Sequence, residues 1–169
     1  MKKKILLILM AVLFVLPLSA ESASVTTDYS EARIQDLKLG SQAWTFRKFS
    51  FYEMLDMMQD LDLHYLQAYP GQVLDKKNSN GRFGHNMSND QIAEVKQALK
   101  DHDIKLIAYG VVGFNNNEES VKVVFEFAKK MGIRTVITEP KYDDYSIIEK
   151  MVKKFNIQVA IHNHPYPSK

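Results

Sequence analysis

Two histidines near the C-terminus are spaced so that they could act together. His162 and His164 are two residues apart within a run, residues 157–164, that is rich in apolar and β-branched side chains. Because side chains alternate between the two faces of a β-strand, both imidazoles are expected on one face. Glu139 ends an earlier run of the same kind, and Pro140 after it favours an extended backbone. Two imidazoles and a carboxylate form a ligand set that suits Zn²⁺, Mn²⁺ or a similar divalent metal.

A plainer interpretation is open for each of these residues. One histidine could be a hydrogen-bonded residue at the rim while the other faces the helices, and Glu139 could cap the helix that follows it. The β-branched run 135–138 leads directly into Glu139. This continuity favours a place in a pocket over a place on the surface.

Four aromatic residues stand late in the other predicted strands. Trp44 and Phe46 close the first run, Tyr69 closes the second, and Tyr109 lies in the third. Such rings could form pocket walls against the C–H faces of a sugar, although the ordinary place of any one aromatic residue is the core. We predict that all four bind substrate.

A long segment, residues 71–87, follows the second run and contains Arg82 and His85. Loops of this length are often lids or binding loops, and we add His85 to the predicted substrate-binding residues. The two remaining histidines have structural interpretations. His64 begins its strand and is expected at the opposite rim, and His102 ends a helix, where a cation is favoured.

The apolar runs alternate with amphipathic segments along the whole chain. The last four runs follow Asp62, Asp103, Gly132 and Asn156, which are residue types that tolerate the turn at a helix C-terminus. Alternation of this kind predicts parallel strands joined by right-handed crossovers. The five predicted strands are residues 39–46, 63–69, 104–112, 133–139 and 157–164.

The intervening segments carry the spacing and the end signals of helices. Ser88 and Gln91 form a capping-box pattern, while Asn117 is a candidate N-cap and Gly132 a stop signal. Apolar residues recur at helical spacing in all four segments. They are Phe51, Met54, Leu55, Met58 and Leu61; Ile92, Val95 and Leu99; Val121, Val124, Phe125 and Ala128; and Ile147, Ile148, Met151, Val152 and Phe155.

Two α/β architectures fit this order, a doubly wound open sheet and a (β/α)8 TIM barrel. A doubly wound nucleotide-binding protein normally has a glycine-rich turn after its first strand, and residues 44–47 contain no glycine. This favours the barrel, truncated after its fifth strand. In either architecture ligands meet the C-terminal ends of the strands, where the candidate residues lie.

Composition and charge narrow the class of protein. Lys2 to Lys4, an apolar stretch to Leu18 and small residues after it are typical of a secretory signal peptide over residues 1–22. The stretch is shorter than a membrane span, so we expect no stable membrane anchor after cleavage and a secreted or periplasmic protein. We predict a polar tail over residues 23–37 and the partial barrel over residues 38–169.

The remaining chain is neutral and contains no cysteine. Removing residues 1–22 takes away three lysines and one glutamate and leaves 19 basic and 19 acidic residues. A neutral balance argues against a nucleic-acid partner. The absence of cysteine excludes disulfides, thiolate zinc sites and a cysteine nucleophile.

The strand-end motifs resemble those of a known group of proteins. Six short motifs carry the resemblance: GSQAWTF (40–46), AYPGQ (68–72), HNMS (85–88), AYGVV (108–112), EP (139–140) and IHNHP (161–165). Together they are similar to the xylose isomerase-like TIM-barrel superfamily, in particular to its secreted sugar phosphate isomerase/epimerase branch. The resemblance covers residues 38–169.

This resemblance implies a metal-dependent sugar isomerase or epimerase. It implies a divalent metal (Mn, Mg or Zn), a small-molecule sugar as the partner, and proton abstraction next to a carbonyl. By position, Glu139 and His162 are implied as catalytic residues, and Glu139 and His164 as metal ligands. The chain departs from many relatives, which have a glutamate near the place of His162 and often an acidic residue in place of Gln67.

These departures leave two other functions open. One is a carbohydrate-binding barrel without catalysis, and the other is a metal-dependent lyase or hydrolase on the same scaffold. The later strands that complete the site in the family lie beyond the five strands predicted here, so we expect the chain alone to be inactive.

Overall fold

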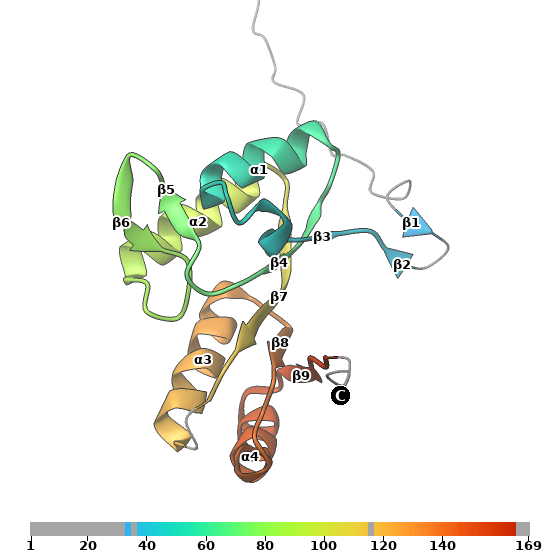
Figure 1. The fold of residues 1–169 in the computed structure, drawn as a ribbon, viewed down its shortest axis with the longest axis vertical. Helices are drawn as coiled ribbons and strands as arrows, with labels where there is room; N and C mark the ends of the chain where they lie inside the picture. Colours follow the sequence, from blue (N-terminus) through green and yellow to red (C-terminus); the bar gives the residue numbers. More distant parts are fainter. Residues whose placement is uncertain (1–32, 35–36, 115–116, 165–169) are drawn as a thin grey trace, which may run out of the picture.

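Five parallel strands form the central sheet of the computed structural model, which describes residues 33–34, 37–114 and 117–164 (Figure 1). The strand order is β3-β4-β7-β8-β9, and every neighbouring pair is parallel. Helices separate these strands along the chain, which confirms the predicted α/β fold with a parallel sheet. The strands are β3 (Ser41–Gln42), β4 (Tyr65–Ala68), β7 (Lys105–Val112), β8 (Thr135–Thr138) and β9 (Gln158–Ile161).

The sheet is open. Over the described residues no strand pairs β9 with β3, so the closed eight-stranded barrel is not formed. Helices pack in neighbouring pairs, α1 with α2 and α3 with α4, and the two pairs lie at opposite ends of the view in Figure 1. The helices are α1 (Phe51–Asp60), α2 (Asn89–Asp101), α3 (Glu118–Met131) and α4 (Tyr145–Phe155).

The first predicted strand is much shorter than expected. After β3 the chain turns into a 3₁₀ helix, η1 (Ala43–Phe46), which the backbone N–H of Arg47 closes by donating to the Trp44 carbonyl at 3.2 Å. Residues three apart share a face in a 3₁₀ helix. Ala43 and Phe46 are therefore both buried, while Trp44 is 53 % exposed. The prediction of a strand over residues 39–46 is wrong beyond Gln42.

The long segment 71–87 contains an antiparallel hairpin that the sequence analysis missed. Strands β5 (Val73–Asp75) and β6 (Asn78–Arg82) lie beside α2 at one side of the molecule (Figure 1). The backbone N–H of Lys77 donates to Oδ1 of Asp75 at 2.9 Å, which stabilises the turn. Two smaller elements complete the fold: the antiparallel pair of β1 (Arg33–Ile34) and β2 (Leu37–Lys38), and the 3₁₀ helix η2 (Tyr142–Asp144).

The predicted ends of the helices are confirmed. Ser88 and Gln91 form a reciprocal capping box, and the Asn117 side chain accepts a hydrogen bond from the backbone of the first turn of α3. All four residues that precede strands β4, β7, β8 and β9 adopt left-handed backbone. Their φ angles are 54° at Asp62, 55° at Asp103, 72° at Gly132 and 53° at Asn156.

One face of the sheet is fully buried against the helices. Leu66, Leu106 and Val136 lie on that face, and the apolar stripes of the helices cover it. Leu61 is an exception to the predicted stripe of α1, because it is the C-cap residue and is 61 % exposed. Gln67 and Ile137 on the opposite face are only partly buried.

Two sequence predictions lie partly or wholly outside the described residues. The predicted signal peptide, residues 1–22, lies outside the described residues. Of the predicted polar tail, residues 23–37, the structure describes only β1 and the first residue of β2. Within the described ranges, no helix is long and apolar enough to cross a membrane.

Candidate metal centre

Glu139, His162 and His164 come together at the C-terminal ends of β8 and β9. Nε2 of His164 is 2.6 Å from Oε1 of Glu139, and Nε2 of His162 is 3.8 Å from the same oxygen. The two imidazole rings are 4.9 Å apart and nearly perpendicular. One ligand atom from each residue lies within 4.8 Å of the other two. The juxtaposition expected from the sequence is therefore present.

The pairing of β8 with β9 produces this arrangement. Thr138 is the register partner of Ile161, and the backbone N–H of His162 donates to the Thr138 carbonyl at 2.9 Å. The ladder thus continues just beyond the last residue of β9, which holds His162 beside Glu139. The strand itself ends at Ile161, so both histidines follow the strand instead of lying in it as predicted.

The donor set fits a divalent metal. Metal–ligand bonds of about 2.0–2.2 Å in a tetrahedral site place donor atoms roughly 3.3–3.6 Å apart. The two distances to Glu139, 2.6 and 3.8 Å, bracket this range, and the three donor atoms all lie within 4.8 Å of one another. Two imidazoles and one carboxylate are an established ligand combination for Zn²⁺ and Fe²⁺, with positions left open for water or substrate.

These residues line a cavity of about 360 Å³. Trp44 and Tyr69 form an aromatic pair on its wall, with ring centroids 5.0 Å apart in an edge-to-face arrangement. Burial raises the pKa of the Tyr69 hydroxyl, which keeps the hydroxyl protonated near neutral pH. The cavity therefore combines the candidate metal ligands with apolar walls. Its lining residues are Gln42, Trp44, Tyr69, Pro70, Gly110, Val111, Glu139, His162 and His164.

Three of the predicted substrate-binding residues lie outside this cavity. Phe46 is in the hydrophobic core at 7 % exposure, because η1 turns it inward. Tyr109 is fully buried on the helix side of β7, with its ring 5.0 Å from that of Phe127 in α3. His85 lies close to Tyr109, with Nδ1 2.9 Å from the hydroxyl oxygen. The structure thus gives these three residues packing contacts away from the metal centre.

Four residues of the cavity wall were not among the predicted site residues: Gln42, Pro70, Gly110 and Val111. Gln42 is the last residue of β3. Its position at the C-terminal end of a parallel strand could have predicted a place in the cavity wall for Gln42. Gly110 lies in β7, and the Gly110 carbonyl accepts a hydrogen bond from Nε2 of Gln67 at 3.4 Å. The motif AYGVV (108–112) contains Gly110, but its place in the cavity wall depends on the register between β4, β7 and β8.

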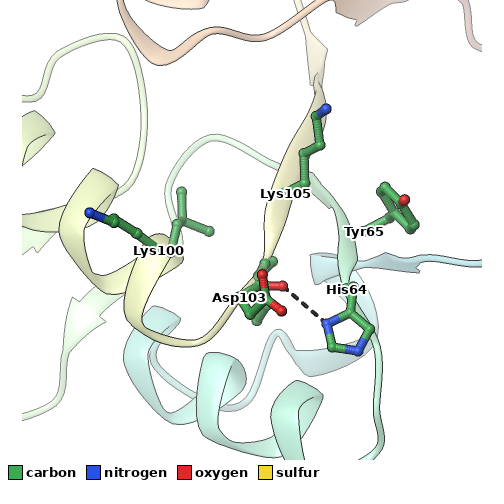
Figure 2. A pocket seen from close by; sticks show the side chains of 7 residues that line it. His64, Tyr65, Lys100, Asp103 and Lys105 are labelled. Atoms are coloured by element: carbon green, nitrogen blue, oxygen red, sulfur yellow. Dashed lines mark hydrogen bonds between the residues drawn. The ribbon is translucent and has the colours of Figure 1, made fainter. Parts of the chain in front are cut away.

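A separate cavity of about 340 Å³ lies at the opposite end of the sheet and includes His64 (Figure 2). Nδ1 of His64 is 3.0 Å from the Asp103 carbonyl oxygen, and Nε2 is 2.8 Å from Oδ1 of Asp62. The ammonium groups of Lys100 and Lys105 point away from this pair. The contacts tie the starts of β4 and β7 together and agree with the predicted structural role of His64.

Comparison with known proteins supports the fold and reaches no family assignment. No family model matches the sequence, and no curated protein matches it. Among solved structures, an uncharacterized protein from Parabacteroides distasonis ATCC 8503 is similar, at 35 % sequence identity and a TM-score of 0.70. The match covers 75 % of this chain and 52 % of that protein.

Two further solved structures are more distant in sequence. A sugar phosphate isomerase/epimerase from Parabacteroides distasonis ATCC 8503 is 14 % identical with a TM-score of 0.54, over 75 % of this chain and 51 % of that one. An AP endonuclease, family 2, from Brucella melitensis is 11 % identical with a TM-score of 0.44, over 69 % and 50 %. The chain spans about half the length of these structures. The fold is thus an α/β fold with a parallel sheet, and its neighbours are of the TIM-barrel type.

Proposed function

We propose that this chain supplies the metal-binding half of a sugar isomerase or epimerase. The observation that carries the proposal is the convergence of Glu139, His162 and His164 on a cavity walled by Trp44 and Tyr69. The likeness of the fold to a sugar phosphate isomerase/epimerase supports the same reaction class. Aromatic walls suit the C–H faces of a sugar ring.

The three residues divide the chemistry between them. A bound divalent metal would polarise a carbonyl oxygen of the sugar. Glu139 and His164 are the closer pair and would hold the ion, while Nε2 of His162 lies 3.8 Å from Glu139 and faces the same space. A neutral imidazole accepts a proton, so His162 would take the proton from the carbon next to the carbonyl and return it. The walls of the cavity would orient the ring.

Metal binding is testable on the chain itself. Glu139→Gln and His164→Ala should each lower bound Zn²⁺ or Mn²⁺ by about tenfold or more in affinity, because each removes a ligand. Metal content after dialysis, measured by mass spectrometry, checks this. His85→Ala is the matched control, since His85 lies outside the cavity. Unchanged metal content in both ligand variants would refute the metal centre.

The reaction class is tested by isotope exchange. A protein that joins this chain to the remaining half of the proposed enzyme, incubated with metal and a panel of ketoses and aldoses in D₂O, should catalyse deuterium incorporation into the sugar at the carbon next to the carbonyl, and His162→Ala should abolish the incorporation. The presence of only one carboxylate in the group favours a second candidate, sugar binding without catalysis. Saturable sugar binding with no exchange for any sugar would establish that candidate in place of the isomerase.

A further inference from the structure

A buried threonine stands directly before the carboxylate of the metal centre. Thr138 is the last residue of β8 and has no exposed surface. It lies on the same face of the strand as the fully buried Val136, on the side that the helices cover. The next residue, Glu139, lies on the cavity side and lines the cavity. The side chain of Thr138 is thus next to the metal centre in the chain without being part of the cavity lining.

The hydroxyl of Thr138 holds the end of β8 to the end of β7. Oγ1 donates a hydrogen bond of 2.7 Å to the Val112 carbonyl, and both residues are buried. The bond lies where the backbone pairing is irregular, because the register of β7 and β8 shifts between Tyr109 and Val112. A buried hydroxyl that had no partner would be costly, so this bond has to form in the folded chain. The side chain therefore supplies a link between the two strands where the ladder is interrupted.

The backbone of the same residue holds the end of β9. The Thr138 carbonyl accepts a hydrogen bond of 2.9 Å from the N–H of His162, one residue beyond β9. Thr138 is thus bonded to β7 through its hydroxyl and to the end of β9 through its carbonyl. Glu139 follows it covalently. A shift of Thr138 would therefore change the position of Glu139 relative to His162.

Glu139 depends on its backbone for its position. Its side chain is 44 % exposed, so little packing holds it in place. Beyond it, the backbone N–H of Lys141 donates to Oδ2 of the buried Asp144 at 2.9 Å. Pro140, between the two anchored residues, has a restricted φ angle. The carboxylate is therefore carried by a short segment that Thr138 fixes at one end and Lys141 at the other.

We propose that Thr138 is a positioning residue of the metal centre. Its hydroxyl fixes the C-terminal end of β8 against β7 and thereby sets the position of Glu139 relative to the two histidines. The proposal rests on the proposed function for the identity of the site, but not for the placement of the strand ends. Valine has nearly the volume of threonine and suits a buried strand equally well, so this role requires the hydroxyl and not the bulk.

Three single variants of the full chain separate positioning from packing. Thr138→Val removes the hydroxyl, Thr138→Ser keeps it, and Thr135→Val makes the same substitution at the start of β8. Co²⁺ is titrated into each protein, and its visible absorption reports both the affinity and the geometry around the ion. Thr138→Val should weaken Co²⁺ binding about tenfold and alter the spectrum, because ligands that lose their support bind a metal less tightly. Thr138→Ser and Thr135→Val should bind Co²⁺ as the unchanged protein does.

A second measurement needs no metal. Amide hydrogen exchange of the metal-free chain, followed by NMR, reports how often the hydrogen bond between His162 and Thr138 opens. Thr138→Val should speed exchange at His162 about fivefold or more, and Thr138→Ser should leave it unchanged. The amide of Ile104, which donates to the Leu99 carbonyl at 2.8 Å just before β7, is the internal control. Loss of overall stability would speed exchange at both amides equally, whereas a local role affects His162 alone.

The outcomes distinguish this proposal from the proposed function. If the unchanged protein binds no Co²⁺ but exchange at His162 depends on the hydroxyl, the metal centre is refuted and the positioning of the strand ends stands. If the unchanged protein binds Co²⁺ and Thr138→Val binds it equally well, the positioning role is overturned and the metal centre stands. An equal loss of affinity in Thr135→Val, or equal acceleration at His162 and Ile104, also overturns the positioning role. Thr138→Ala replaces Thr138→Val in both measurements if the valine variant does not fold.

Discussion

At the scale of single residues, the environment of Tyr109 shows why residue type alone was misleading. An aromatic residue at a strand end suits a pocket wall, but the pairing of Tyr109 with Val136 turns its ring toward α3. Its hydroxyl lies 2.9 Å from Nδ1 of His85. Burial raises the pKa of Tyr109 and lowers that of His85, so both groups stay neutral near pH 7.

Removal of this hydroxyl should destabilise the fold. Tyr109→Phe deletes one buried hydrogen bond and leaves Nδ1 of His85 without that partner, so we expect a loss of about 1 kcal/mol in the free energy of unfolding. Urea denaturation followed by circular dichroism measures it. Tyr142→Phe serves as the control, because Tyr142 is 89 % exposed. An equal effect in the two variants would contradict a structural role for the Tyr109–His85 pair.

At the scale of elements, the turn before β9 depends on a left-handed residue. Asn156 ends α4 with φ of 53°, a conformation that asparagine tolerates and β-branched residues do not. Asn156→Val should therefore cost about 1–2 kcal/mol of stability. Asn156→Gly should be neutral or slightly stabilising, since glycine adopts this conformation freely. Thermal unfolding of both variants checks the difference, and similar melting temperatures would argue against it.

The contact between β7 and β8 requires a glycine. A Cβ atom at Gly110 would collide with the backbone carbonyl of Ile137, and φ at Gly110 is 152°. Gly110→Ala should destabilise the protein by about 1–3 kcal/mol, because the two strands must move apart. Gly113→Ala is the matched control, since a Cβ there would meet no atom within 4 Å. Denaturant midpoints of the two variants should differ clearly.

At the scale of the whole molecule, ionisable contacts make stability depend on pH. His102 joins two helices: Nε2 is 2.9 Å from Oδ1 of Asp56 in α1, and Nδ1 is 2.7 Å from the Ala98 carbonyl in α2. Burial acts to lower the pKa of His102, but these two contacts, with Asp101 nearby, raise it overall. The stabilisation is therefore complete below the ordinary histidine pKa of 6.5 and is lost as pH rises through the folded-state value.

Other groups act in the opposite direction. Hydrogen bonds from the Ser50 backbone and from Lys76 lower the pKa of Glu53 to about 2, and contacts with Lys150 and Lys153 lower the pKa values of Glu118 and Glu149. Burial lowers the pKa of His85. These contributions are present above the unfolded-state pKa of each group and are lost as pH falls through the folded-state value.

Together these effects predict maximal stability near pH 6.5. The free energy of unfolding should rise from pH 3 to about pH 6.5 and fall at higher pH. His102→Gln should flatten the alkaline side of the profile and leave the acidic side in place. Urea denaturation at a series of pH values measures both limbs. An unchanged alkaline limb in His102→Gln would assign the fall to another group.

The sequence by itself determined the alternation of five parallel strands with four helices, the caps of α2 and α3 and the neighbourhood of Glu139 and the two histidines. These features rest on local rules: helical periodicity, capping pairs such as Ser88 with Gln91, and left-handed residues before strands. The cluster of candidate metal ligands was also predictable, because the C-terminal ends of adjacent parallel strands meet at one edge of the sheet.

Only the tertiary structure decided which other side chains reach that edge. Strand register turned Tyr109 toward α3, the 3₁₀ turn buried Phe46, and the hairpin within residues 71–87 brought Arg82 into one cavity with Arg47. None of these outcomes follows from local spacing. Each depends on contacts between segments far apart in the chain, whose geometry is fixed only when the sheet and its loops pack together.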